Sequence, residues 1–409
     1  MTVIIRNADL IESVADALQY ISYFHPMDYI RALGDAYEAE QSPAAKDAIA
    51  QILTNSRMCA EGHRPLCQDT GIVNVFVEWG MDCRLENTSA SLQDVIDEGV
   101  RRAYLHPENK LRASVLADPA FTRRNTKDNT PCVLHVDLVP GSKVSVDVAA
   151  KGGGSENKSK FKMMNPSDNI VDWVVEMLPQ MGAGWCPPGM LGIGIGGTAE
   201  HCVLLAKQAL MEPIDMGPLK ARGPKNDIEV MRIEIFDKVN ALGIGAQGLG
   251  GLATILDVKI MDAPCHAAGK PVAMIPNCAA TRHAHFTLDG TGPAYLEAPK
   301  LDEWPKVDWT PDAAAIRVDL DTLSPDVVAG WKQGDRLLLN GKMLTGRDAA
   351  HKRIADMLAK GEELPVSFKG RMIYYVGPVD PVGEEIVGPA GPTTSSPTAN
   401  ASSIALVSF

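Results

Sequence analysis

The sequence lacks several patterns that would assign it quickly to a class of protein. No stretch approaches the roughly 18 uninterrupted apolar residues of a membrane-spanning helix, so we expect no membrane span. The first residues lack the basic and then apolar build of a secretory signal, and we expect a cytoplasmic protein. Basic residues are outnumbered, with 39 Lys and Arg against 51 Asp and Glu and a formal net charge of −12. An acidic chain is poorly matched to a phosphate backbone, so we expect no nucleic-acid partner.

Eight cysteines are present, but no two of them form a Cys-x-x-Cys pair. A zinc ribbon or a thioredoxin-type motif therefore has no support. A disulfide framework is not expected in a chain of 409 residues without a secretory signal. Most of these cysteines are predicted to be small buried side chains, and only those with unusual neighbours are candidates for chemistry.

The composition, 45% hydrophobic and 22% charged, is that of a globular protein long enough for two or three domains. Periodicity predicts helices over residues 11–21, 43–55, 168–180, 199–211, 226–241 and 348–359. It predicts strands over residues 72–79, 132–139, 143–149, 190–195, 315–320 and 336–339. We therefore predict a mixed α/β protein: an N-terminal α+β domain over residues 1–286, a linker over 287–311 and a smaller C-terminal α/β domain over 312–409.

Three cysteines lie in loops whose neighbours are unusual for a packing residue. Cys67 is followed by Gln, Asp, Thr and Gly, a polar run that indicates a loop lining a site. Cys186 precedes two prolines, which hold the chain extended and present the thiol on a stiff loop. Cys278 lies in a polar loop, twelve residues after His266.

These residues alone leave several chemistries open. Three thiolates can hold an iron–sulfur cluster with one iron open to a ligand, but zinc hydrolysis and plain buried cysteines compete with it. The run Gly152–Gly154 is either an anion-binding nest of N–H groups or a flexible turn. The glycines at 192, 194 and 197 match a dinucleotide-binding fingerprint, a weak signal on its own. His283 and His285 are weak evidence for zinc without a third ligand.

Taken together, the motifs resemble those of class I fumarases in their order along the chain. The matching segments are Cys67-Gln-Asp-Thr-Gly, Lys151-Gly-Gly-Gly-Ser-Glu-Asn, Trp185-Cys-Pro-Pro, Gly196-Gly-Thr, Gly245-Ala-Gln-Gly, Gly346-Arg-Asp-Ala-Ala-His-Lys-Arg and Gly391-Pro-Thr-Thr. This hydro-lyase family also includes tartrate dehydratases. The resemblance covers most of the chain.

The resemblance implies a [4Fe–4S] cluster on Cys67, Cys186 and Cys278, with the fourth iron binding the substrate. The implied substrate contacts are Gln68, Asp69, Arg112, Gly154 and Arg347. The implied catalytic residues are Asp69, His266 and Thr393, with His266 paired to Asp69 and Thr393 transferring a proton. The expected reaction is reversible hydration of fumarate to (S)-malate by a homodimer, with a small dicarboxylate as substrate.

Two alternatives accompany this expectation. The chain could be a related hydro-lyase that acts on tartrate or mesaconate. It could also be a catalytically impaired fumarase, because the sequence departs from the family near its C-terminus. Pro397 stands where the family has an arginine, and the lysine that binds substrate in the family is missing. From this departure we expect a truncated C-terminal domain.

Overall fold

The computed structural model of the chain describes residues 2–307, 310, 313–332, 335–346, 348–374 and 376–390. The helices are α1 (Asn7–Tyr23), α2 (Met27–Ala39), α3 (Pro43–Gly62), α4 (Leu92–Tyr104), α5 (Gly153–Glu156), α6 (Ile170–Met181), α7 (Ala199–Ala209), α8 (Met216–Arg222), α9 (Asp227–Ala241), α10 (Pro325–Ala329) and α11 (Asp348–Ala359), with the 3-10 turns η1 (Ala246–Gly248) and η2 (Leu301–Glu303). The strands are β1 (Val3–Ile5), β2 (Ile72–Gly80), β3 (Cys83–Leu85), β4 (Leu116–Ala117), β5 (Arg124–Asn125), β6 (Val133–Val139), β7 (Val144–Lys151), β8 (Lys160–Met164), β9 (Gly189–Gly196), β10 (Ile255–Ala263), β11 (Lys270–Asn277), β12 (His283–Leu288), β13 (Ile316–Asp319), β14 (Leu337–Asn340), β15 (Leu344–Thr345) and β16 (Ile373–Tyr374). The predicted mixture of helix and strand is confirmed.

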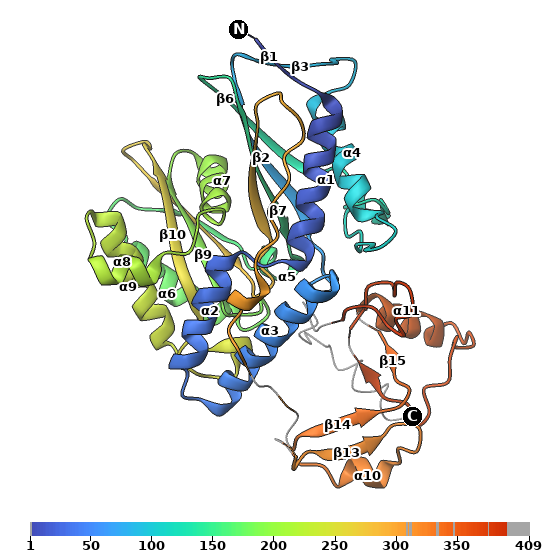
Figure 1. The fold of residues 1–409 in the computed structure, drawn as a ribbon. Coiled ribbons are helices and arrows are strands. Elements are labelled where there is room, and N and C mark those ends of the chain that lie inside the picture. The colour runs from blue at the N-terminus through green and yellow to red at the C-terminus, as the bar shows by residue number, and fades with distance from the viewer. Residues whose placement is uncertain are drawn as a thin grey trace.

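The first of two four-stranded sheets has the order β12-β7-β2-β6. Strand β2 runs antiparallel to β7 and parallel to β6. Helices α1 and α4 pack against one another, and α1 also contacts β7 and β12 (Figure 1). Their apolar faces form one core with alternate residues of β7, including Val144, Val146 and Val148, each fully buried. This alternation is what a sheet with one covered face requires.

The second four-stranded sheet has the order β10-β9-β11-β8, and helix α7 lies across β9, β10 and β11 (Figure 1). The glycines of β9 explain the close approach of α7. A Cβ at Gly192 would lie 2.1 Å from the carbonyl oxygen of Ala206, and one at Gly194 would lie 2.0 Å from that of Cys202. The pattern that formally matches a dinucleotide fingerprint therefore serves the packing of a helix directly on a strand backbone.

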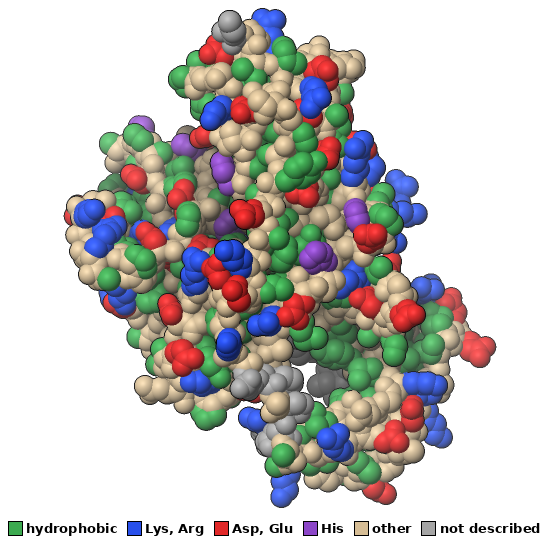
Figure 2. All heavy atoms as spheres, viewed as in Figure 1, with side chains coloured by type: hydrophobic (Ala, Val, Ile, Leu, Met, Phe, Trp, Pro, Cys, Tyr) green, Lys and Arg blue, Asp and Glu red, His purple; other side chains and the backbone are tan. Residues whose placement is uncertain are grey.

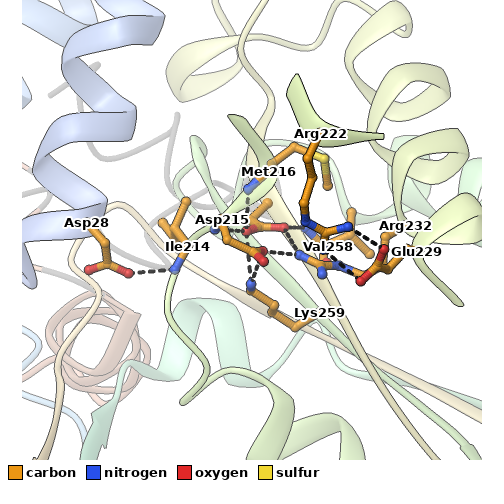
Figure 3. Close-up of polar contacts among 10 residues, drawn as sticks. Asp28, Ile214, Asp215, Met216, Arg222, Glu229, Arg232, Val258 and Lys259 are labelled. Atoms are coloured by element: carbon orange, nitrogen blue, oxygen red, sulfur yellow. Dashed lines mark hydrogen bonds and ion pairs between the residues drawn. The ribbon is translucent and has the colours of Figure 1, made fainter. Parts of the chain in front are cut away.

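A buried ionic network ties α8 and α9 to β10 (Figure 3). Arg232 donates to the carbonyl oxygen of Val258 at 2.6 Å and pairs with the carboxylates of Asp215 and Asp257. Lys259 lies 2.5 Å from Asp215 and 3.2 Å from Asp257. Burial would raise the pKa of Asp215, but hydrogen bonds from Arg232 and Lys259 outweigh it and hold that pKa at about 2. Within this network the two positive charges of Arg232 and Lys259 balance the two carboxylates.

The segment after β12 runs along α1, α2 and α3 before the C-terminal elements begin. Trp304 is buried there and donates through Nε1 to Ser56 Oγ at 3.1 Å. Beyond it, β13 pairs with β14 and β15 pairs with β16, each as a two-stranded parallel sheet. These elements form a smaller body beside the rest of the chain, with acidic and basic side chains interspersed on the face shown in Figure 2. In the described part of the chain, no helix is both long and apolar enough to span a membrane.

Candidate functional site

The three candidate cysteines are carried by three loops that the two sheets bring together. Cys67 lies between α3 and β2, Cys186 lies between α6 and β9, and Cys278 follows β11 directly. Strands β9 and β11 pair with Met190 opposite Asn277, so the start of one strand meets the end of the other. The backbone N–H of Ala279 then donates to the carbonyl oxygen of Cys186 at 2.9 Å. The Cys186 and Cys278 loops are therefore direct neighbours.

Electrostatic coupling places Cys67 with the other two. Burial raises the pKa of the Cys67 thiol to about 12; the charge of Arg282 opposes this rise, and a thiolate at Cys278 adds to it. Burial also raises the pKa of Cys186, and thiolates at Cys278 and Cys67 raise it further. Thiolate charges at neighbouring cysteines thus act on both Cys67 and Cys186, which places the three loops close together. All three are partly exposed, whereas Cys59, Cys83, Cys132 and Cys202 are buried.

The Cys186 loop is fixed by contacts to its proline carbonyls. Cys186 has a left-handed backbone conformation, with φ of 58°. The carbonyl oxygen of Pro187 accepts from both the backbone N and the side-chain Nε2 of Gln247, each at 2.8 Å. The hydroxyl of Tyr29 donates to the carbonyl oxygen of Pro188 at 3.2 Å. These contacts hold the thiol in one place, as a preformed ligand set requires.

The Cys278 loop is held by contacts on both of its sides. Lys151 Nζ lies 2.6 Å from the carbonyl oxygen of Pro276, and His25 Nε2 lies 2.8 Å from that of Ala279. On the Cys67 side, Asn55 donates to the carbonyl oxygen of Leu66 at 3.1 Å. Each of these side chains bonds to a main-chain carbonyl beside a cysteine. The bonds therefore hold the loops without using the thiol groups.

The donor set fits an iron–sulfur cluster better than a single metal ion. Among the residues that the structure describes, no three His, Cys, Asp or Glu side chains are placed to hold one metal ion. In a four-iron cluster each thiolate binds a different iron, so the three sulfur atoms need not meet at one point. Thiolates are soft ligands that suit such clusters, and the positive charge of Arg282 acts on Cys67.

A cavity of about 240 Å³ opens beside the Cys67 loop. Its walls include three of the predicted substrate contacts, Gln68, Asp69 and Arg112. The full lining is Gln68, Asp69, Thr70, Ile72, Arg112, Ser114, Lys151, Gly153, Glu156 and Asn157. Gly154 lies in the same turn as Gly153, within α5. The structure thus brings three predicted residues together at one cavity and places Gly154 next to a residue of its wall, while their contact with substrate stays a prediction.

The triple glycine does bind an anion, and that anion is a side chain of the protein. The backbone N–H of Gly153 donates to Asp69 Oδ2 at 2.7 Å, and that of Gly71 donates to Oδ1 at 3.1 Å. Arg282 donates to the backbone carbonyl oxygens of Asp69 and Ala150. Asp69 is therefore held in one orientation at the cavity wall.

The structure does not place His266 beside Asp69 within this chain. His266 is exposed in the turn between β10 and β11, where its Nδ1 accepts from the N–H of Ala268 at 3.1 Å. Cys278 follows the other end of β11, an eight-residue strand that rises about 3.3 Å per residue. The ends of this strand lie more than about 20 Å apart. His266 and Cys278 are twelve residues apart in the sequence, but most of the residues between them form a full strand.

Two further predicted residues, Arg347 and Thr393, lie outside the described residues, so their positions stay predictions. Sequence reasoning also missed three side chains that shape the site: His25, Lys151 and Arg282. Of these three, only Lys151 belongs to a sequence motif, because it is the first residue of the segment Lys151-Gly-Gly-Gly-Ser-Glu-Asn. His25 and Arg282 stand in no motif and reach the site through the fold.

Comparison with known proteins identifies the family of the chain. A family model described as fumarate hydratase (Fumerase) matches residues 11–287, and one described as fumarase C-terminus matches residues 290–400. Because the second match extends to residue 400, the comparisons do not identify the C-terminal domain as truncated. That part of the expectation is not confirmed.

Individual relatives extend the likeness over most of the chain. The aerobic class I fumarate hydratase of Escherichia coli is 30% identical over 376 residues, 88% of this chain and 67% of the relative. Fumarate hydratase 2 of Leishmania major is 30% identical over 399 residues, 93% of this chain and 68% of the relative. A Methanocaldococcus jannaschii protein named "Putative L(+)-tartrate dehydratase subunit alpha" is 36% identical over 279 residues, 66% of this chain and 94% of the relative. The chain therefore belongs to the fumarate hydratase family of hydro-lyases.

Proposed function

We propose that the protein catalyses the reversible hydration of fumarate to (S)-malate, with a [4Fe–4S] cluster held by Cys67, Cys186 and Cys278. The observation that carries this proposal is that three loops with partly exposed thiols lie together, with the Cys67 loop beside a cavity lined by Gln68, Asp69 and Arg112. When bound, the cluster would supply a Lewis acid for the hydroxyl group of malate.

The residues of the chain supply the rest of the proposed chemistry. Malate is a dianion, and the fork of an arginine such as Arg112 suits a carboxylate in a cavity of this size. Asp69 presents a carboxylate whose two oxygens are oriented by the N–H groups of Gly71 and Gly153. A group at this position can hold or move a proton at the substrate carbon. Arg347 and Thr393 remain proposed as a second carboxylate clamp and a proton-transferring residue.

A second substrate class has specific support. The Methanocaldococcus jannaschii relative is named as a putative tartrate dehydratase subunit and matches 66% of this chain. Tartrate differs from malate by one hydroxyl group, and one added hydroxyl discriminates weakly unless a site is built to bond it. Tartrate and mesaconate are therefore the alternatives to test.

Steady-state assays on anaerobically reconstituted protein test the proposal. We expect turnover of (S)-malate and fumarate to exceed that of tartrate and mesaconate. Arg112→Gln is expected to lower kcat/KM by about thirtyfold to several thousandfold, the cost of breaking a buried charge pair. Lys110→Gln is a matched control, because Lys110 is an exposed neighbour. Preferred turnover of tartrate would replace the proposed substrate, and a cluster-loaded protein that turns over none of the four would overturn the activity.

The homodimer and the cytoplasmic location also stay proposals. Two exposed sheet edges support self-association: Val136 and Leu138 on β6, and Met163 on β8, are exposed apolar side chains on outermost strands. Such edges are covered in most stable proteins. Sedimentation of the wild type and of Leu138→Lys tests this, since a dimer that uses this edge is expected to dissociate in the variant.

A further inference from the structure

Lys151 ends β7 and is almost completely buried, with 3% of its surface exposed. Its Nζ lies 2.5 Å from Ser155 Oγ and 2.6 Å from the carbonyl oxygen of Pro276. Ser155 belongs to the glycine-rich turn that orients Asp69, and Pro276 stands two residues before Cys278. One ammonium group therefore joins the turn that lines the cavity to the segment that carries a cysteine.

The charge of Lys151 is only partly balanced by nearby side chains. Glu156 Oε2 lies 3.9 Å away, but both oxygens of that carboxylate accept from Lys207 at 2.5 and 2.6 Å. Two ammonium groups thus share one carboxylate. Arg282 adds one more cation beside the same cavity, and Asp69 adds one carboxylate. Positive charge is in excess here, which suits a cavity that receives an anion.

The pKa of Lys151 agrees with this geometry. Burial lowers the pKa of Lys151 to about 8, and a thiolate at Cys278 acts in the opposite direction. The ammonium form therefore still predominates at pH 7, and it lies close enough to Cys278 to interact with its charge.

We propose that Lys151 is a positioning residue: through Pro276 it fixes the segment that carries Cys278, and its positive charge offsets the negative charge of the thiolates and of the cluster they hold. The first part concerns this chain alone. The second part rests on the proposed function, because it requires the cluster.

Hydrogen–deuterium exchange of the metal-free protein tests the first part. The amide of Ala279 bonds to the Cys186 carbonyl, so its exchange reports on the closure of the two loops. Lys151→Met is expected to speed this exchange about tenfold or more, the effect of losing one charged hydrogen bond. Lys151→Gln keeps a donor and is expected to restore most of the protection. Lys270→Met is the control, because Lys270 also holds two carbonyls, those of Pro166 and Asp168, at the opposite end of β11.

Wild-type exchange at Ala279 in Lys151→Met would overturn the positioning role. If circular dichroism shows that Lys151→Met does not fold, Lys151→Gln decides: the proposal requires Ala279 exchange closer to wild type in Lys151→Gln than in Lys151→Ala. Equal exchange in those two variants would contradict it.

The reduction potential of the reconstituted cluster tests the second part. Removal of a positive charge makes the addition of an electron harder, so the potential is expected to fall in both Lys151→Met and Lys151→Gln and to stay unchanged in Lys270→Met. An unchanged potential in the Lys151 variants would overturn the charge role. If the wild type took up no cluster, the proposed function would fail and the charge role with it, while the exchange measurement would still decide the positioning role.

Discussion

The N-terminal region and the C-terminal region differ in the size of their sheets and in the number of apolar side chains that they bury. Residues 2–307 hold two four-stranded sheets whose inner faces are buried under helices. In the described part of residues 313–390 the sheets have two strands each, and the buried apolar side chains are Val318, Leu320, Val376 and Val379. The difference indicates that the three cysteine loops owe their positions to the N-terminal core, whereas the C-terminal region acts by docking against it.

Among the described residues, several polar contacts join the two regions. Arg64 forms a two-pronged pair with Glu385 at 2.7 and 2.9 Å, Lys110 lies 3.1 Å from Asp380, and Arg112 donates to the carbonyl oxygen of Gly377 at 2.5 Å. Arg112 also lines the cavity beside Cys67. Movement of the C-terminal region is therefore expected to shift this side chain and change the shape of the cavity.

The largest effect is expected where two cysteine loops touch in the N-terminal core. A Cβ at Gly189 would lie 1.8 Å from the carbonyl oxygen of Asn277, a backbone atom that cannot move aside. Gly189→Ala is therefore expected to cost about 4 kcal/mol or more in the free energy of unfolding, measured by urea denaturation. Gly217→Ala, whose Cβ would meet nothing within 4 Å, is the control. Equal stability of both variants would show that the loops are not held rigidly.

The next largest effect is expected in the pH dependence of stability, through the buried His25 in the same core. Burial is the main cause that lowers the pKa of His25 from 6.5 to about 4. The unfolded chain therefore binds a proton at a higher pH than the folded chain, and stability is lost as pH falls from about 6.5 to about 4. The shift corresponds to about 3 kcal/mol when that loss is complete. His25→Gln is expected to abolish this part of the pH dependence, and an unchanged profile in that variant would contradict the assignment.

A smaller effect is expected at the docking contact. Arg64 and Glu385 are partly buried, so Arg64→Met is expected to weaken docking by about 1–2 kcal/mol. The hydrogen bond from Arg64 lowers the pKa of Glu385, so this contribution is present above the usual Glu pKa and is lost as pH falls below it. Limited proteolysis is expected to cleave residues 313–390 faster in the variant, with the N-terminal region left intact. Equal cleavage of both regions would contradict separate docking.

The smallest effect is expected for Lys110 and Asp380, which are both exposed. Such pairs contribute about 0–1 kcal/mol, so Lys110→Ala is expected to leave the proteolysis rate within about twofold of wild type. A change as large as that of Arg64→Met would show that the pair is stronger than its exposure implies.

Local elements could be predicted from the sequence in both regions. Helix α3 begins at the predicted residue 43, with Ser42 capping it and accepting from the N–H of Ala45, and α11 spans the predicted residues 348–359. Helix α3 runs on to Gly62, past the predicted end, because no breaker interrupts it before the left-handed His63. Helix α2 was missed, since its neighbours on α3 supply much of its burial.

The assembly of the site could be predicted only in part. Motif resemblance gave Cys67, Cys186 and Cys278, and the structure brings the loops of Cys186 and Cys278 together through the pairing of β9 with β11. Pairing between segments about eighty residues apart leaves no local signal, so neither Lys151 nor the distant turn that holds His266 could be placed. Division into domains at residues 286 and 312 stays a proposal.

The central claim is that the N-terminal core presents three thiols as one ligand set, and counting iron and sulfide in the anaerobically reconstituted chain tests it most directly. The account predicts about four irons per chain in the wild type. It predicts loss of the cluster in Cys67→Ser, Cys186→Ser and Cys278→Ser, and retention in Cys83→Ser, Cys132→Ser and Cys202→Ser. Full loading in any two of the first three variants, or loss of the cluster in the other three, would contradict the assignment of these loops.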